Sequence, residues 1–263
     1  MNNANVTGHG QSATDPTAQV VLAYAAEDGC RTLGEAIAGP GGVEVVEALR
    51  QLLIQAQITY RQCPCPWPAD ADPEVIISRA AEACDNYVLV LSPYTLADVF
   101  CLQGLLFALS LNKRIVPVLI ETVAAHHLPE PLQTLETIDL RDRSVPLTQT
   151  DGGRQLLQTL HHAADYHHAH TQLLVRALQW ERQQRHQDLL LQGDELIQYQ
   201  RWLVQANGQF AERSRTDLER VSVPESHHRP IQLQTLYIAE SARHQTSQDN
   251  AVALGMSWLK RWL

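Results

Sequence analysis

One segment, Asp85 to Ile120, constrains the fold of this chain more than any other. It holds two short apolar runs, Tyr87–Leu91 and Ile115–Ile120, with a helix-length apolar stretch, Val99–Leu111, between them. Such runs are typical of buried strands, and the stretch between them is long enough for a helix. A strand, a helix and a second strand in this order form the crossover that joins parallel strands. The segment therefore predicts a parallel sheet.

The same alternation extends from residue 20 to residue 140. Further strands are expected at Val20–Tyr24, Ile58–Tyr60 and Leu135–Leu140. Apolar residues spaced three and four apart predict a helix over 45–56, and a proline start predicts another at Pro73–Ala83. Strands that are apolar throughout are buried on both faces. We predict an α/β, flavodoxin-like open parallel sheet with helices on both faces.

From about Thr148 the strand signals end and glutamine, histidine, leucine and arginine dominate. Five helices are expected there: Gly153–Tyr166, His170–Gln192, Asp194–Ala206, Ile231–His244 and Ala251–Leu263. The predicted organisation is a disordered tail over 1–18, a sheet domain over 19–166 and an all-helical annex over 167–263.

Composition excludes several classes of function. The net charge is −9, which argues against nonspecific nucleic-acid binding because that needs a basic surface. No apolar run approaches the roughly 20 residues of a membrane span, and the polar N-terminus is not a secretory signal. The cysteines number five, which is odd and sparse for a disulfide framework. We predict a cytoplasmic protein with reduced thiols.

Four places in the first half resemble the TIR domain family. Tyr24 and Asp28 follow the first strand as in the family's first motif, and Asn86–Pro93 matches a strand that ends in Ser-Pro. Phe100-Cys101 matches an aromatic-cysteine pair, and Asn112–Val118 matches the entry to the next strand. The resemblance implies the flavodoxin-like fold, a role in protein–protein interaction and self-association through the TIR-like domain.

The annex is similar to the segment that follows the TIR domain in bacterial, often cyanobacterial, TIR proteins. Four stretches carry this similarity: His170–Arg182, Leu189–Leu196, Trp202–Ala206 and Leu233–Ser241. In those relatives a membrane helix or WD repeats often follow. We expect such modules to be absent here or carried by another chain.

The resemblance also implies where a catalytic acid would stand. In TIR domains that cleave NAD, a glutamate follows the cysteine by three positions; here that position is Gly104. We therefore predict a non-catalytic interaction or scaffold module in an oligomeric signalling or defence assembly, with no cofactor. One alternative is an NAD-cleaving enzyme with a relocated acid, Glu121 or Asp98. Another is a nucleotide sensor without turnover.

Under either alternative, Tyr24, Asp28 and Ser92 would line the nucleotide crevice at the strand ends. Candidate protein contacts are Trp67 in the proline-rich loop, Phe100 and Cys101 on the helix Val99–Leu111, and Trp258 and Trp262 near the C-terminus. Tryptophans with basic neighbours give residues 251–263 an amphipathic character. This end could dock on the annex, bind a partner or touch a membrane surface peripherally.

No metal is predicted. Cys63-Pro64-Cys65 lacks a second ligand pair, and a packed loop is the simpler interpretation. Mixed pairs such as His161 with Asp165, or Asp165 with His168, could share a helix face and ligate a metal. A solvated helix face is the favoured interpretation of these residues.

Overall fold

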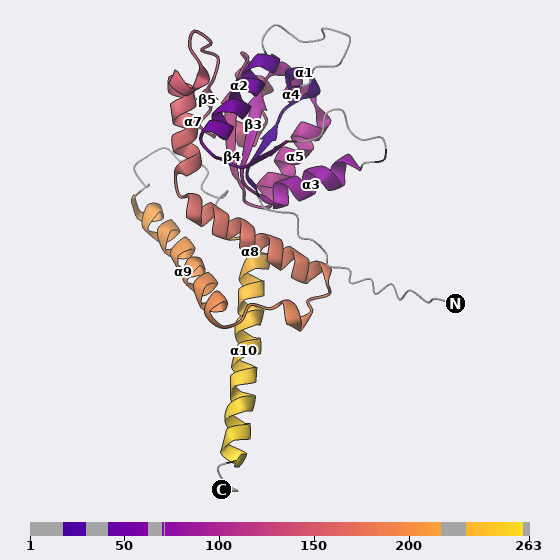
Figure 1. Cartoon of the computed structure of the whole chain (residues 1–263), viewed down its shortest axis with the longest axis vertical. Coiled ribbons are helices and arrows are strands. Elements are labelled where there is room, and N and C mark those ends of the chain that lie inside the picture. The colour runs from indigo at the N-terminus through magenta and orange to yellow at the C-terminus, as the bar shows by residue number, and fades with distance from the viewer. Residues whose placement is uncertain (1–17, 30–41, 63–69, 71, 217–229, 260–263) are drawn as a thin grey trace, which may run out of the picture.

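The computed structural model of this protein describes residues 18–29, 42–62, 70, 72–216 and 230–259 (Figure 1). A sheet covered by helices stands above a group of long helices in this view. The tail predicted for 1–18 lies outside the described residues, except that Ala18 begins the first strand. Trp67 and Trp262 also lie outside them, and only the backbone of Trp258 is described, within the last helix.

The sheet region has the predicted flavodoxin-like architecture. Its strands are all parallel and lie in the order β2-β1-β3-β4-β5. The strands are β1 Ala18–Ala23, β2 Tyr60–Gln62, β3 Cys84–Leu91, β4 Arg114–Leu119 and β5 Ile138–Asp139. The helices of this region are α1 Ala26–Gly29, α2 Gly42–Gln55, α3 Pro73–Glu82, α4 Pro93–Ala97, α5 Val99–Ser110, α6 Glu130–Gln133 and α7 Asp151–His161, with short 3-10 turns at Ala125–His127 and Leu147–Gln149. The predicted fold class is confirmed.

Two strands differ from their predicted positions. The strand predicted at Ile58–Tyr60 begins only at Tyr60, because Ile58 belongs to the turn after α2 and donates its N–H to the Leu53 carbonyl at 2.9 Å. Ile58 is apolar because it packs into the core. The last strand is reduced to Ile138–Asp139, which pairs with Val118 and Leu119 of β4.

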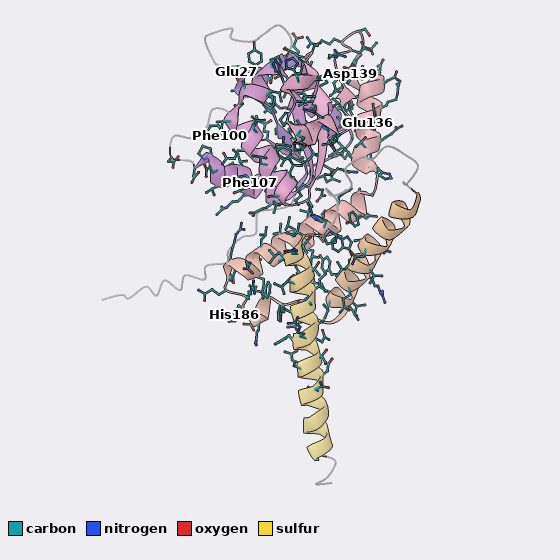
Figure 2. The ribbon with its side chains drawn as sticks, turned by 180° about the vertical axis from the view of Figure 1, so that it is seen from behind. Glu27, Phe100, Phe107, Glu136, Asp139 and His186 are labelled. Carbon is teal, nitrogen blue, oxygen red and sulfur yellow. The ribbon has the colours of Figure 1, made fainter. Side chains whose placement is uncertain are left out.

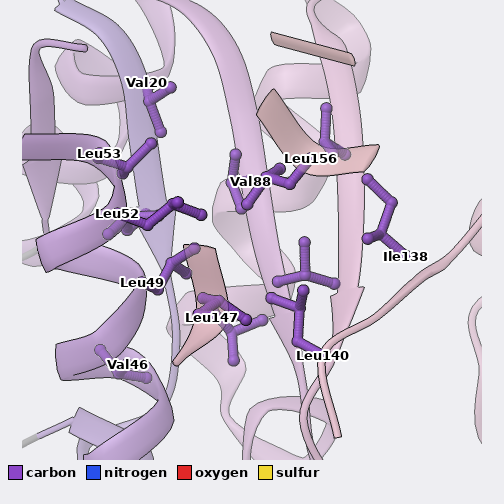
Figure 3. Packing of buried hydrophobic residues seen from close by; sticks show 14 of the residues in the cluster. Val20, Val46, Leu49, Leu52, Leu53, Val88, Ile138, Leu140, Leu147 and Leu156 are labelled. Atoms are coloured by element: carbon purple, nitrogen blue, oxygen red, sulfur yellow. The ribbon is translucent and has the colours of Figure 1, made fainter. Parts of the chain in front are cut away.

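The two faces of the sheet carry separate cores, because successive strand residues point to opposite faces. Val20 and Leu22 of β1 pack with residues of α2 and α7 (Figure 3). Val21 and Ala23 pack on the other face with residues of α3 and α5. β3 is buried along its whole length, as expected of a central parallel strand. Full burial of a leucine or valine contributes about 1.5–3 kcal/mol relative to exposure.

Short polar side chains fix the starts of helices around this sheet. Asp72 caps α3 by accepting from the Glu74 N–H at 3.0 Å, and Pro73 occupies the first helical position. Ser92 and Asp98 cap α4 and α5 in the same way. Each such cap is worth about 1 kcal/mol.

The annex consists of α8 Ala164–Arg182, a 3-10 turn at Gln187–Leu189, α9 Gly193–Thr216 and α10 Gln232–Leu259. The single helix predicted over Gly153–Tyr166 is wrong, because the chain turns at Ala163, whose φ is 51°. The boundary expected between residues 166 and 167 consequently falls inside α8. The two helices predicted at Ile231–His244 and Ala251–Leu263 are one continuous helix as far as Leu259, and its second half extends away from the body (Figure 1).

Aromatic residues hold the annex together. Trp180 of α8 lies 5.3 Å from Tyr237 of α10, and Trp202 of α9 stacks on Tyr166 at 5.4 Å. Ser241 accepts from the Leu191 N–H at 3.0 Å, and the hydroxyl of Tyr237 donates to the Leu189 carbonyl. Polar groups of α10 thus satisfy the backbone of the connection between α8 and α9.

Candidate functional site

The first candidate site is the edge of the sheet at the carboxyl ends of β1, β3 and β4. In an open sheet of this strand order, ligands bind outside the carboxyl ends where the chain switches from β1 to β3. The residues after β1 are Tyr24 to Asp28, those after β3 are Ser92 to Thr95, and Glu121 follows β4. Figure 2 shows Glu27 and Asp139 at this end of the molecule.

Asp28 is the buried centre of this edge. Its Oδ2 accepts hydrogen bonds from the hydroxyls of Ser92 at 2.5 Å and Thr95 at 3.0 Å. The Thr95 hydroxyl also accepts from the Ala25 N–H at 3.2 Å, so the exits of β1 and β3 are tied together. The structure therefore brings Asp28 and Ser92 into direct contact at this edge.

Burial raises the pKa of Asp28 above its ordinary value, although the Ser92 and Thr95 hydroxyls oppose the change. The negative charges of Glu121 and Glu27 act in the same direction as burial. The Oδ1 atom of Asp28 is buried and has no hydrogen-bond partner among the described residues. This carboxyl group consequently holds its proton more readily than an exposed aspartate does.

Tyr24 faces different partners. Its hydroxyl donates to Gln62 Oε1 at 3.0 Å and accepts from Arg50 at 2.6 Å, and the Arg50 guanidinium lies 5.5 Å from the ring centre. These contacts join β1 to α2 and β2 rather than to Ser92. The ring also packs against Gly29, where an added Cβ would lie 2.0 Å from the Tyr24 ring.

Position 104, where the TIR resemblance places the catalytic glutamate, is closed to a side chain. An added Cβ on Gly104 would lie 2.3 Å from the hydroxyl of Tyr87 and 3.1 Å from Ile77. Gly104 is buried between α5, α3 and β3. The space that a longer side chain would need is occupied by Tyr87.

The two acids named as replacements have different environments. Asp98 is half-buried, and its Oδ1 accepts from the N–H groups of Phe100 and Cys101 at 2.8 and 2.9 Å, which makes it the cap of α5. Glu121 is half-exposed directly after β4 and is close enough to Asp28 to raise its pKa. Of the two, Glu121 is the acid whose charge acts on Asp28.

The most exposed apolar residues of α5 are not the residues that were predicted as protein contacts. Cys101 is buried, so its thiol is not available to a partner, which corrects that expectation. Phe100 is half-buried and lies with Phe107 along one side of the ribbon in Figure 2. The most exposed apolar residues of the helix are Val99 at 66% and Leu106 at 64%. They stand two turns apart and therefore share a face.

The opposite edge of the sheet, at the amino ends of β3 and β4, holds buried charges that sequence reasoning missed. The Lys113 ammonium donates to the Cys84 carbonyl at 2.8 Å and to the Thr171 hydroxyl of α8 at 3.0 Å. Arg114 donates to Asn86 Oδ1 at 2.6 Å and to the His162 and Leu160 carbonyls at 2.7 and 3.1 Å. Both side chains thus bind the sheet to the helices that follow it.

Burial is the main influence on the pKa values of both cations. It lowers the pKa of Lys113 to about 8 and that of Arg114 to about 10, while the negative charge of Asp85 opposes both changes. Asp85 is itself buried, and its Oδ2 lies 3.1 Å from His168 Nδ1 of α8. A charged residue directly beside a fully apolar strand run was the sequence signal that could have identified these groups.

Metal ligands are not gathered in the described part of the chain. No group of three or more His, Cys, Asp or Glu side chains suited to a metal ion occurs there. Cys63 and Cys65 lie outside the described residues. His161 and Asp165 sit on different helices, α7 and α8, so the helix face on which that pair was expected does not exist.

Comparison with known proteins locates one family match. Residues 43–157 match the family model described as TIR domain. Among solved structures, the chain is similar to the TIR domain of the Toll-related Receptor TRR-2 from Hydra magnipapillata, with 22% identity over 55% of this chain and 98% of that chain and a TM-score of 0.42. None of the curated proteins matches.

Two further similar structures are of a metazoan TIR-STING receptor from C. gigas. The one in complex with 2',3'-cGAMP has 19% identity over 55% of this chain and 40% of that chain, with a TM-score of 0.40. The other has 18% identity over 56% and 41%, with a TM-score of 0.37. Within the described part of this chain, no helix has both the length and the apolar composition of a membrane span.

Proposed function

We propose that this chain, whose residues 43–157 match the TIR domain family model, is a non-catalytic protein–protein interaction module that self-associates or joins a larger assembly. The observation that supports this most directly is the apolar face of α5. Val99 and Leu106 are both about two-thirds exposed on one side of a helix whose other side is buried in the sheet core. Exposed apolar residues grouped on one element are typical of interaction surfaces.

The absence of a carboxylate at position 104 supports the non-catalytic part of the proposal. A glycosyl-bond cleavage passes through an oxocarbenium-like transition state that a carboxylate stabilises. Gly104 supplies none, and the Tyr87 hydroxyl fills the adjacent space. The module would act by recognition, in the cytoplasm, within a signalling or defence assembly.

The annex extends the same proposal. Its similarity to the segment after the TIR domain in bacterial proteins suggests that it links this domain to the rest of such an assembly. The contacts of Lys113 and Asp85 with α8 would couple the position of the annex to that of the sheet region.

The first experiment is the size distribution of the full chain by sedimentation velocity over a range of concentrations. We expect concentration-dependent association that Leu106→Lys weakens at least about tenfold, since central interface residues often contribute 2 kcal/mol or more. The matched control is Ile54→Lys, because Ile54 is similarly exposed, at 54%, on a different helix, α2. A wild-type protein that stays monomeric, or two variants with equal effects, would overturn the assignment of the interface to α5.

A second candidate function rests on Glu121. Its half-exposed side chain lies near Asp28, whose pKa is raised, so two carboxyl groups stand at one crevice edge. In this version the chain cleaves NAD, and Glu121 stabilises the cationic ribose. Nicotinamide release at high protein concentration should then be abolished by Glu121→Gln. It should survive in Asp98→Asn, since asparagine retains the helix cap.

Nicotinamide release that does not exceed that of a heat-inactivated control would leave the interaction module and the nucleotide sensor as candidates. Saturable NAD or cyclic-nucleotide binding with no product would single out the sensor. Binding of neither, together with association through α5, would support the interaction module.

A further inference from the structure

A cavity of about 350 Å³ lies between the amino edge of the sheet and the corner where α7 meets α8. It is lined by Gln19 and Thr59 at the starts of the sheet strands, by Asp85 of β3, and by His161, Asp165 and His168 of the two helices. Its volume lies in the range of small-molecule sites, which occur preferentially at junctions between structural units. It is at the opposite end of the strands from the Asp28 crevice.

The lining of this cavity is acidic. Asp85 and Asp165 contribute carboxylates, and no lysine or arginine occurs among the described residues that line it. Lys113 and Arg114, the cations nearest to Asp85, direct their hydrogen bonds to Cys84, Thr171, Asn86 and the end of α7 instead. The lining therefore favours a positively charged occupant.

Asp85 is the strongest reason to expect such an occupant. Its side chain is 6% exposed, and its Oδ1 has no hydrogen-bond partner among the described residues. A buried carboxylate oxygen without a donor is costly, and a donor normally completes it. An ammonium group carries three donors and no acceptor, which suits this oxygen.

His168 is a hydrogen-bond partner of only one of the two oxygens of Asp85. Since a carboxylate only accepts, the Nδ1 of His168 must carry the proton that it shares with Asp85 Oδ2 at 3.1 Å. Its Nε2 lies 2.9 Å from the amide nitrogen of Gln172, and Gln172 Oε1 accepts from the Tyr199 hydroxyl at 3.4 Å. Oδ1 of Asp85 is therefore left for a further donor, and the partly exposed His168 lines the cavity beside it.

We propose that this cavity binds a small organic amine, best a diamine, with one ammonium on Asp85 and the other on Asp165 at the rim. Bound there, the amine bridges β3 of the TIR domain and α8 of the annex. It would strengthen the contact between the two regions without touching the carboxyl edge.

The test is calorimetric titration of the full chain with 1,4-diaminobutane, alongside the neutral 1,4-butanediol of the same length. We expect saturable one-to-one binding of the diamine and none of the diol. Asp85→Asn should weaken binding about tenfold or more, and Asp165→Asn should weaken it several-fold. Glu130→Gln removes an exposed acid on α6 and should leave the affinity unchanged.

Absence of saturable diamine binding would overturn the proposal, as would equal binding of the diol. Unchanged affinity in Asp165→Asn would also overturn it, and this variant decides the matter if Asp85→Asn does not fold, because Asp165 is exposed. A loss of affinity in Glu130→Gln equal to that in Asp165→Asn would show a general charge effect instead of a site.

Discussion

The two ends of the sheet use polar groups in opposite ways. At the carboxyl end, Asp28, Ser92 and Thr95 form a closed network within the sheet region, and the acids around it repel one another. At the amino end, Lys113 and Arg114 connect the sheet to α7 and α8. The first arrangement shapes a crevice edge, and the second joins two regions. We therefore expect mutations at the amino end to affect parts of the molecule that lie further from the mutated residue.

The largest effect is expected from Arg114→Ala. The change removes donors to Asn86 and to two carbonyls at the end of α7, all largely buried. Loss of one partner from a buried charged network typically costs about 3–5 kcal/mol. Urea unfolding should show this loss, and Arg154→Ala, on the exposed surface of α7, should change stability by less than about 1 kcal/mol. Equal effects of the two variants would remove the distinction between a structural junction and a surface charge.

A somewhat smaller loss is expected from Gly104→Glu. The new Cβ would overlap the Tyr87 hydroxyl, so overpacking should destabilise the protein by about 1–3 kcal/mol. Restoring the acid should give no NAD cleavage, because the space for it is filled. Combining it with Tyr87→Phe should recover part of the stability, since the two positions are in contact. A well-folded Gly104→Glu protein that releases nicotinamide would contradict the closed site.

Lys113→Met should have little effect at neutral pH, in contrast to Arg114→Ala. The Thr171 hydroxyl also donates to the Cys84 carbonyl, at 2.9 Å, so that acceptor keeps a partner when the ammonium is gone. Replacing a buried charge by an apolar group of similar volume is often neutral or stabilising.

The pH dependence of stability provides the sharper readout for Lys113. Its pKa in the folded protein is about 8, below the ordinary 10.5, so between these values the unfolded chain binds the extra proton. Wild-type stability should therefore rise with pH in that window relative to Lys113→Met, by an amount on the order of a few kcal/mol. Parallel curves for the two proteins between pH 8 and pH 10 would contradict the lowered pKa.

The smallest effect is expected from Asp28→Asn at the carboxyl end. The asparagine oxygen can accept from Ser92 and Thr95 as before, so stability at neutral pH should change by less than about 1 kcal/mol. Because burial raises the pKa of Asp28, its contribution is present in acid and lost as pH rises above the ordinary value of 3.8. At low pH the wild-type protein should therefore be more stable than Asp28→Asn. Acid unfolding should show that this difference shrinks as pH rises toward neutral. The opposite slope would show that the carboxylate, not the acid, is the favoured form.

Particular elements show how far the sequence predicted this structure. The run Tyr87–Leu91 lies in β3, and the run Ile115–Ile120 lies in β4 except for its last residue, because a strand buried on two faces has to be apolar throughout. Ile58 was wrongly assigned to a strand because it is apolar and buried, although its backbone does not join the sheet. The break at Ala163 carries no glycine or proline, so no local signal marked it.

For the candidate site too, the sequence predicted some features and missed others. Asp28 and Ser92 follow strands that the sequence located, so their proximity was predictable from the parallel order alone. The orientation of Tyr24 toward Arg50 and the burial of Cys101 were not, because both depend on which way a side chain turns at a given backbone position.

The sequence alone determined the sheet, its flanking helices and the glycine at position 104, because hydrophobic periodicity and residue identity are local properties. Tertiary structure alone decided that Tyr87 fills the space beside Gly104, that Asp98 is a helix cap, and that Lys113, Arg114 and Asp85 join the sheet to α7 and α8. These arrangements depend on contacts between residues far apart in the chain, and the burial that sets their charges exists only after folding.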